Sequence, residues 1–561
     1  MKRIILDENI KSASSNGERT AEGFAAPVYH GSFGSNRRDF IGVMATLMIG
    51  IGCKKFLTTK PTDFVSPVNY FKNASEVNSA LNGVYNVVGL EAMWGSQIPI
   101  RQNIGTDESF LSYTKWPTGP FFYNFDPSDP YVLNTWRNCY IGIERANLLL
   151  ANLEGADMDS SEKGAVRGQA LFLRAFYYYT LVQYYGDVPL KLTPTSSVNN
   201  VSIASTPAKD VYDQILSDME EAEGLVQTAS EIGYGGRISK STVRGILARV
   251  CLTMAGNPLK DTAKFQDALE WSSKVIDSGE HLLNPDYTQF YINFCQDLYD
   301  VKDSIWEVEL YGNNNDANRQ AGRHGNENGI SHKPSDFANI GYAYGFNSTT
   351  WKLYHLFDDI DLRRDWSIAP FSYSDKTSYK KKDYSDSSIV QRSCGKFRRE
   401  YELDKPMNKN YTPINFPMLR YSDVLLMFAE AENEINGPSQ QAYDKINMVR
   451  ERGYGKLLTG ATNPEEAHLR TGLSKDDFRK AIQDERAREL CFEGLRKHDL
   501  IRWGIFVDAM KQTAEDFGAH APASYAYAMT AAENVSAKHV LYPKPALELS
   551  LNKALKQNPG W

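Results

Sequence analysis

The sequence predicts an all-α protein built on a tetratricopeptide-like helix-pair scaffold, with long loop-rich aromatic insertions and minor β hairpins. Three observations support this fold class. Segments with apolar residues every three or four positions dominate the chain up to about residue 300 and return after residue 420. Gly and Pro turns separate them, as between the two helices of a repeat. Two other segments, 96–135 and 310–350, lack this period and are rich in Asn, Gly, Pro and aromatic residues.

The spacing of apolar residues in each periodic segment predicts a helix there. In 74–88 the apolar residues recur at steps of three or four, which predicts one buried face. The segment 159–185 has the strongest pattern, and we expect Leu173, Phe176 and Leu181 to be buried on one face of a long helix. The remaining predicted helices are 208–225, 240–254, 262–278, 421–435, 441–452 and 474–493.

Short strands are expected only between the two groups of helices. Residues 304–310 alternate apolar and polar side chains, which is typical of a strand, and residues 370–415 suggest hairpins and turns. We therefore divide the chain beyond residue 75 into an N-terminal helical region, 76–300, and a C-terminal region, 301–561, of one fused body.

The N-terminus has the features of an export signal. Two arginines precede an apolar run, 41–51, and a glycine then precedes Cys53. This order is typical of a signal peptide, and the run is too short to span a bilayer. Because a cysteine at this place resembles a bacterial lipobox, we predict a signal peptide over 1–52, lipidation of Cys53 and a tether over 53–75. A signal peptide with an incidental cysteine is the alternative, and the arginine pair leaves the Sec and twin-arginine routes open.

Composition and motifs argue against several classes of protein. The net charge is −7, from 62 basic and 69 acidic residues, so a general nucleic-acid binder is not expected. No CxxC, HExxH or G-x-S-x-G motif occurs, and the nine histidines are scattered, so we expect neither a metal site nor a cofactor. Five cysteines follow Cys53, an odd number that argues against a disulfide framework but leaves one pair open.

Paired carboxylates need separate treatment, because a glycosidase requires only two of them. The candidates are the neighbours Asp107 and Glu108 and the trio Asp358, Asp359 and Asp361. Such clusters are expected by chance among 69 acidic residues, and Arg363 and Arg364, which follow Asp361 and Leu362, favour a structural network. We therefore do not expect an enzyme, and an α-helical carbohydrate-active enzyme is a remote alternative.

The two aperiodic segments carry the candidate binding residues. Trp94 and Trp116 lie in or beside the first segment, and Tyr342 and Tyr344 lie in the second. Neighbouring Gly and Pro residues allow turns that expose rings, and Trp and Tyr lose little entropy when they bind. Rings of this kind stack on the apolar faces of sugars, while amides such as Gln102 suit the hydroxyl groups. The alternative is that these rings anchor the loops on the helical body.

Several blocks of sequence resemble the SusD/RagB family of outer-membrane nutrient-binding lipoproteins. They follow one another in the family's order from Cys53 to Trp561, nearly the whole mature chain. The blocks include 167–178, 185–190, 305–308, 419–426, 499–504 and 557–561.

The resemblance implies an all-α, non-enzymatic protein that is anchored by lipid in the outer membrane and exposed on its outer face. It implies capture of oligosaccharides or polysaccharides and their delivery to a SusC-like TonB-dependent transporter. Capture of peptides or another nutrient on the same scaffold is the second interpretation. Arg/Glu pairs such as Glu485–Arg486 resemble buried framework, and no shared motif identifies the ligand residues, which vary within the family.

Overall fold

The computed structural model describes residues 70–197, 202–314 and 320–561. The predicted signal peptide and Cys53 lie outside the described residues. All of the described residues belong to one compact unit, Pro61–Trp561. Within them, no helix combines the length and apolarity that crossing a bilayer requires. The five described cysteines are buried and free, so none of them forms the disulfide that the sequence left open.

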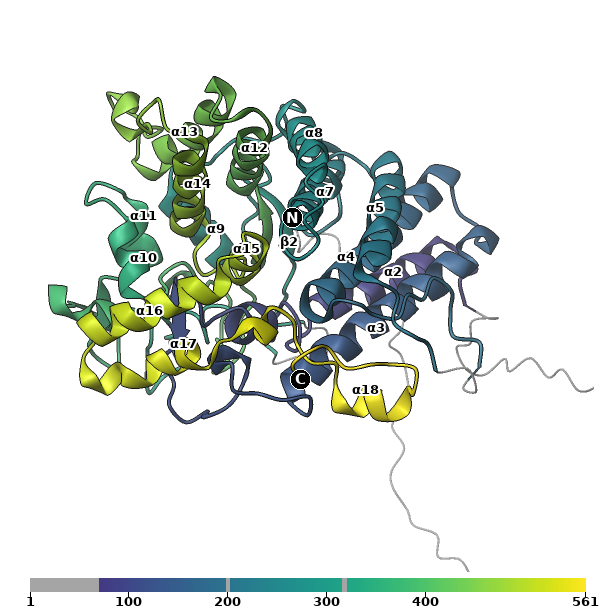
Figure 1. Cartoon of the computed structure of the whole chain (residues 1–561), viewed down its shortest axis with the longest axis horizontal. Coiled ribbons are helices and arrows are strands. Elements are labelled where there is room, and N and C mark those ends of the chain that lie inside the picture. Colours follow the sequence, from purple (N-terminus) through teal and green to yellow (C-terminus); the bar gives the residue numbers. More distant parts are fainter. Residues whose placement is uncertain (1–69, 198–201, 315–319) are drawn as a thin grey trace, which may run out of the picture. The chain divides into compact units, whose positions relative to one another are not determined.

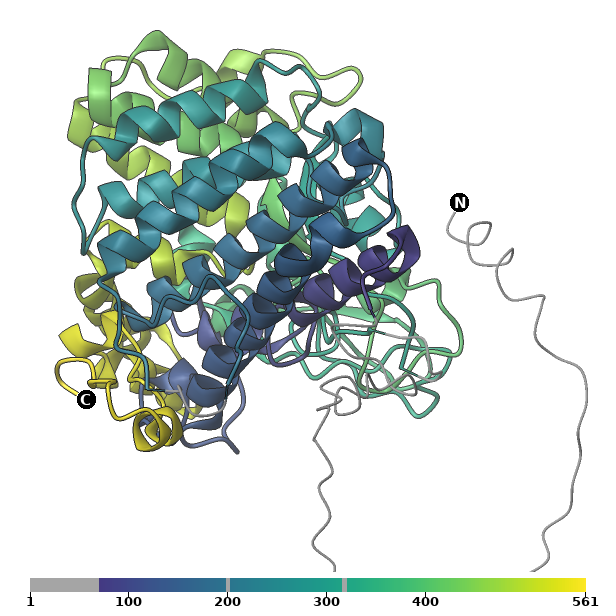
Figure 2. The ribbon, with the colours of Figure 1, turned by 90° about the vertical axis from the view of Figure 1, so that its right-hand side faces the viewer.

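The N-terminal half is a row of helices that pack on one another in the order of the sequence, as Figures 1 and 2 show. The main helices are α2 (Ala74–Val88), α3 (Pro130–Asn152), α4 (Ser160–Tyr185), α5 (Ala208–Leu225), α7 (Lys240–Ala255) and α8 (Lys264–Ile276). Helix α3 packs on α2 and α4, α5 packs on α4 and α7, and α7 packs on α8. The short helices α6 (Ala229–Ile232) and α9 (Tyr287–Cys295) complete this half.

The C-terminal helices continue the row through α12 (Tyr421–Asn436), which packs on α8. Helix α12 also packs on α7, α13 (Gln440–Gly453) and α14 (Lys475–Leu490). Helix α16 (Phe506–His520) is similar in length to these, and the shorter helices are α10 (Trp351–Leu356), α11 (Arg363–Ser367), α15 (Arg496–Arg502), α17 (Thr530–Asn534) and α18 (Ala546–Leu551). The predominance of helix confirms the all-α prediction, and the succession of packed helices is consistent with a tetratricopeptide-like scaffold.

Helices α2 and α5 have the predicted bounds, and α4 begins one residue after the predicted start. There the Asp159 carboxylate caps the helix by accepting hydrogen bonds from the first-turn N–H groups of Ser161 and Glu162. The prediction that Leu173, Phe176 and Leu181 are buried is confirmed, since none is more than 3 % exposed.

Helix α3 is the main element that the apolar spacing did not predict. Its first residues fall in the aperiodic segment that ends at residue 135, although the helix begins at Pro130. The local signal was present: Asp129 caps the helix by accepting from the N–H of Tyr131 at 2.8 Å, and Pro130 occupies the first turn, where its missing N–H costs nothing.

Among the described residues, the strands form three two-stranded antiparallel sheets. The strands are β1 (Ser109–Leu111), β2 (Ser304–Val308), β3 (Asn347–Thr349), β4 (Phe371–Tyr373), β5 (Lys381–Asp383) and β6 (Phe416–Arg420). Strand β2 confirms the strand predicted at 304–310 and pairs with β6, while β4 and β5 form a hairpin. Strand β1 pairs with β3, with Leu111 opposite Asn347, and so joins the two aperiodic segments.

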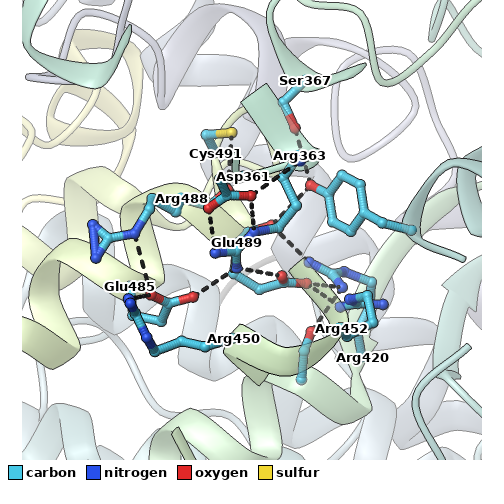
Figure 3. Close-up of polar contacts among 12 residues, drawn as sticks. Asp361, Arg363, Ser367, Arg420, Arg450, Arg452, Glu485, Arg488, Glu489 and Cys491 are labelled. Atoms are coloured by element: carbon cyan, nitrogen blue, oxygen red, sulfur yellow. Dashed lines mark hydrogen bonds and ion pairs between the residues drawn. The ribbon is translucent and has the colours of Figure 1, made fainter. Parts of the chain in front are cut away.

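Buried ion pairs connect the C-terminal elements (Figure 3). The Glu489 carboxylate of α14 accepts hydrogen bonds from Arg452 at 2.5 Å, Arg420 at 2.7 Å and Arg363 at 3.1 Å. Burial alone would raise the pKa of Glu489, but these guanidinium groups hold it well below its usual range. Arg363 also pairs with Asp361 at 2.7 Å, so the structural role predicted for Asp361 is confirmed.

Candidate functional site

The pairing of β1 with β3 fixes the backbone of the candidate site. Directly after β1, the N–H and hydroxyl of Ser112 donate to the carbonyl oxygens of Phe346 and Gly345, both at 2.8 Å. Gly345 has a φ of +67°, and a Cβ there would lie 2.8 Å from that of Ser331, so the turn requires glycine. The N–H of Tyr344 donates to the Asn326 carbonyl oxygen at 2.6 Å. Residues 344–346 of the second aperiodic segment are therefore held by hydrogen bonds to Ser112 and to Asn326.

Five aromatic side chains from the two segments form a continuous contact chain. Trp116 lies 5.0 Å from Phe346 between ring centroids, Phe346 lies 5.1 Å from Tyr344, and Tyr344 lies 5.1 Å from Tyr342. Tyr113 lies 4.7 Å from Trp116 and 4.9 Å from Phe346. Phe346 is buried, and the other four are half-buried. We call these five residues the aromatic row.

The aromatic row contains Trp116, Tyr342 and Tyr344 but not Trp94, the fourth candidate. The backbone N–H of Trp94 donates to the Val88 carbonyl oxygen at the end of α2, which turns the chain back on that helix. Its ring lies in the hydrophobic core, 6.3 Å from that of Phe176. Trp94 is only 9 % exposed, so it offers no surface ring.

The amides expected beside the rings in the first segment lie elsewhere. Gln102 is fully buried, and its amide donates to the Thr135 hydroxyl at 2.8 Å. Asn103 is also buried, and its amide donates to the Gly494 carbonyl oxygen at 2.8 Å. The expectation that Gln102 offers hydrogen bonds at the site is wrong, because these amides position α3 and the chain after α14.

A half-buried cation supports one end of the aromatic row. The Arg101 guanidinium carbon lies 4.1 Å from the Trp116 ring centroid, and the group donates to the Tyr131 hydroxyl at 2.9 Å. Arg101 also forms an ion pair with Glu327, which is fully buried. Burial by itself lowers the pKa of Arg101, and the Glu327 carboxylate more than offsets it, so the pKa is raised. Trp116 therefore rests on a fixed positive charge.

Polar groups of a third segment, 405–412, lie at the other end. The Lys409 ammonium lies 5.0 Å from the Tyr342 ring centroid, and the Tyr344 hydroxyl donates to the Asn410 side-chain oxygen at 3.0 Å. Burial raises the pKa of Tyr342 above its usual value, so its hydroxyl is a neutral donor at physiological pH. The sequence pattern suggested only hairpins and turns for this segment. The mixture of Lys, Asn and Tyr residues in segment 405–412 is the feature of the sequence that could have indicated a binding segment.

The carboxylates considered for catalysis in the first segment are committed to the interior. Asp107 pairs with Arg496 at 2.8 Å and Lys352 at 2.9 Å. Burial alone would raise the pKa of Asp107, but these cations lower it well below its usual range. Glu108 is buried beside it and accepts a hydrogen bond from the Phe492 N–H at 3.1 Å. Across the ranges that the structure describes, no group of three or more His, Cys, Asp or Glu side chains is placed to hold a metal ion.

Comparisons with known proteins agree with this architecture. A model of the SusD family matches residues 367–561, and a model described as starch-binding, associating with the outer membrane, matches residues 55–252. The SusD-like protein P2 of Formosa agariphila is 28 % identical over 545 residues, which cover 93 % of this chain and 99 % of that protein.

Solved structures show the same relationship. A SusD homologue from Bacteroides thetaiotaomicron is 30 % identical, with a TM-score of 0.81 over 88 % of this chain and 98 % of that one. Surface glycan-binding protein A from the same organism, solved with laminarihexaose, is 20 % identical, with a TM-score of 0.65 over 87 % of this chain and 100 % of that one.

The fold and the site therefore define a helical scaffold that presents a row of aromatic rings on its loops. The chain belongs to the SusD/RagB family, which confirms the resemblance drawn from its sequence blocks.

Proposed function

We propose that this protein captures glycans at the outer membrane and binds them on the aromatic row. The observation that carries the proposal is the contact chain from Trp116 through Phe346 to Tyr344 and Tyr342, in which the outer rings keep part of their surface exposed. The match to a family model described as starch-binding and the fold shared with a protein solved with laminarihexaose support a glycan as the ligand.

The proposed binding combines ring stacking with hydrogen bonds. The apolar C–H faces of a sugar cover the exposed ring surfaces, which are already ordered by their neighbours and lose little entropy on binding. The exposed Lys409 and the half-buried Asn410 stand at the Tyr342 end, where they can meet hydroxyl groups. The half-buried rings form two pairs, Tyr113 with Trp116 at 4.7 Å and Tyr342 with Tyr344 at 5.1 Å between centroids, and each pair contacts the buried Phe346, so the row offers stacking surfaces to more than one sugar.

We further propose that the protein is a non-enzymatic lipoprotein, anchored through Cys53 on the outer face of the outer membrane. It would deliver glycans to a SusC-like TonB-dependent transporter. Membership of the family and the signal-like N-terminus support these proposals. The burial of the first-segment carboxylates in ion pairs and hydrogen bonds supports the absence of catalysis.

The test is to replace Trp116 and Tyr342 separately by Ala and to titrate each variant with laminarihexaose and a panel of other glycans. For the best ligand of the parent we expect each variant to bind about tenfold or more weakly, because each loses one stacking surface of about 1.4 kcal/mol or more. Trp271→Ala, at a half-buried tryptophan of α8 outside the row, is the matched control and should bind as the parent does.

If both row variants keep the parental melting temperature and the parental affinity, the row is not the site. Titration with a peptide panel tests the second interpretation, capture of peptides. If the protein binds peptides tightly and binds no glycan, peptides are the ligand class instead. New reducing ends after incubation with glycans would show an enzyme instead.

A further inference from the structure

Two adjoining internal spaces lie away from the aromatic row and share no residue with it. The inner space has a volume of about 40 Å³ and lies against Trp94 and Phe176. The outer space has a volume of about 370 Å³, within the range of small-molecule sites. Both are lined by Gln183, Thr253, His498 and Arg502, so the two spaces are neighbours on either side of these residues.

Three of the described residues that line the inner space each carry a buried polar atom without a partner. Among the described residues, Trp94 Nε1, Arg249 Nε and His498 Nε2 are buried and make no hydrogen bond, and all three residues line this space. The indole and guanidinium N–H groups can only donate. Leaving such groups unpaired is costly, and native proteins retain few of them. A group that pairs with these donors must therefore supply a hydrogen-bond acceptor.

The charges around the inner space are already balanced. Arg249 pairs with Asp423 at 2.6 Å, and Arg502 pairs with Asp499 at 2.8 Å and with Glu430. An anion placed here would be buried without a countercharge, which is unfavourable. Burial lowers the pKa of the neighbouring His498 to about 3, so the imidazole is neutral at physiological pH and supplies no positive charge. The geometry therefore favours an uncharged acceptor.

The outer space has an apolar wall and reaches the surface. Helix α16 contributes Phe506 and Val507, and the segment after α7 contributes Leu259. The exposed residues Pro258 and Gly504 also line it, which places its mouth at the surface. A hydrocarbon group that enters here would leave water for an apolar environment.

We infer that these two spaces form a binding site for a small uncharged amphiphile. Its carbonyl or hydroxyl oxygen accepts hydrogen bonds from Trp94 Nε1 and Arg249 Nε in the inner space, and its hydrocarbon part fills the outer space. This site is separate from the proposed glycan site, so a ligand can occupy each at the same time. Trp94 therefore has a second role besides core packing, because its indole N–H is a hydrogen-bond donor for a ligand in the inner space.

The test uses three probes that carry the same heptyl chain: octanamide, octanoate and heptyltrimethylammonium. Calorimetric titration of the mature chain should show saturable binding of octanamide and at least about tenfold weaker binding of both charged probes. Absence of octanamide binding, or equal binding of the three head groups, overturns the proposal. A crystal structure of the protein with octanamide that shows only water in both spaces also overturns it.

Two variants locate the binding. Val507→Trp and Leu259→Trp each fill part of the outer space and should weaken octanamide binding about tenfold or more. Gln512→Trp, at an exposed position of α16, is the matched control and should bind within about twofold of the parent. If Val507→Trp and Leu259→Trp both fold and bind octanamide as tightly as the parent does, the proposed location of the site is wrong. If both variants unfold, the comparison of the three head groups on the parent protein still tests the proposed site. Octanamide should leave the affinity for glycans unchanged in every folded variant.

Discussion

Glu108 is a buried carboxyl group that is protonated at neutral pH. Burial raises its pKa to about 8, although the nearby Arg496 guanidinium opposes the shift. An ordinary glutamate, as in the unfolded chain, has a pKa of 4.5. Between these two values the folded state binds more protons than the unfolded state. The contribution of Glu108 to stability is therefore fully present below pH 4.5 and is lost as the pH rises through 8.

Glu108→Gln should remove this pH dependence, because glutamine keeps an acceptor oxygen for the Phe492 N–H and does not ionise. We expect the melting temperature of the variant to fall less than that of the parent between pH 5 and pH 9. Thermal unfolding at several pH values measures this difference. Glu533→Gln, at an exposed position, is the control and should follow the parent. Identical pH profiles for the parent and Glu108→Gln would show that Glu108 is ionised throughout.

At the scale of elements, the close approach of α3 and α4 depends on one small residue. A Cβ at Gly142 of α3 would lie 2.3 Å from the Tyr177 ring of α4. That ring cannot easily move away, because the Tyr177 hydroxyl donates to the Val84 carbonyl oxygen of α2 at 2.6 Å. Helices α2, α3 and α4 therefore meet at Gly142, where there is no room for a side chain.

Gly142→Ala should destabilise the protein by about 1–3 kcal/mol, the usual cost of overpacking a core, although alanine is the better helix former. Gly224→Ala in α5 is the matched control, because open space surrounds a Cβ there. It should stabilise the protein by up to about 1 kcal/mol through helix propensity alone. Chemical denaturation measures both values. A Gly142→Ala variant as stable as Gly224→Ala would show that the two helices separate without cost.

At the scale of the whole molecule, the helices form the support and the loops carry the proposed glycan site. Buried ion pairs such as Arg363 with Glu489 tie the C-terminal helices to the scaffold, while β1 and β3 fasten the loops to each other. The membrane attachment that we propose depends on Cys53, which lies outside the described residues. Acyl chains contribute about 0.8 kcal/mol for each CH₂ group that enters the membrane.

Cys53→Ala should therefore shift the protein from the membrane fraction to the soluble fraction and abolish incorporation of labelled palmitate. Fractionation of cells that express each variant, followed by immunoblotting, measures this shift. Lys54→Ala keeps the cysteine and should remain in the membrane fraction. The lipoprotein proposal fails if Cys53→Ala stays with membranes and the parent incorporates no palmitate.

Local patterns in the sequence were enough to predict the helical scaffold and the family. The spacing of apolar residues places α2, α4, α5 and α12 to within a residue or two at each end, because a helical face is encoded by residues three or four positions apart. Helix α3 was not predicted because its first turn follows a segment without period and its start is marked by the cap at Asp129 rather than by apolar spacing.

Which rings reach the surface depends instead on how distant parts of the chain pack together. Trp94 and Trp116 lie in similar surroundings, each followed by a Gly or Pro, yet Trp94 packs in the core and Trp116 joins the aromatic row. Likewise, the row exists because β1 meets β3 more than 200 residues later in the chain. Helical periodicity is a local property, whereas the exposure of a ring depends on contacts between residues far apart in the sequence, which no local pattern encodes.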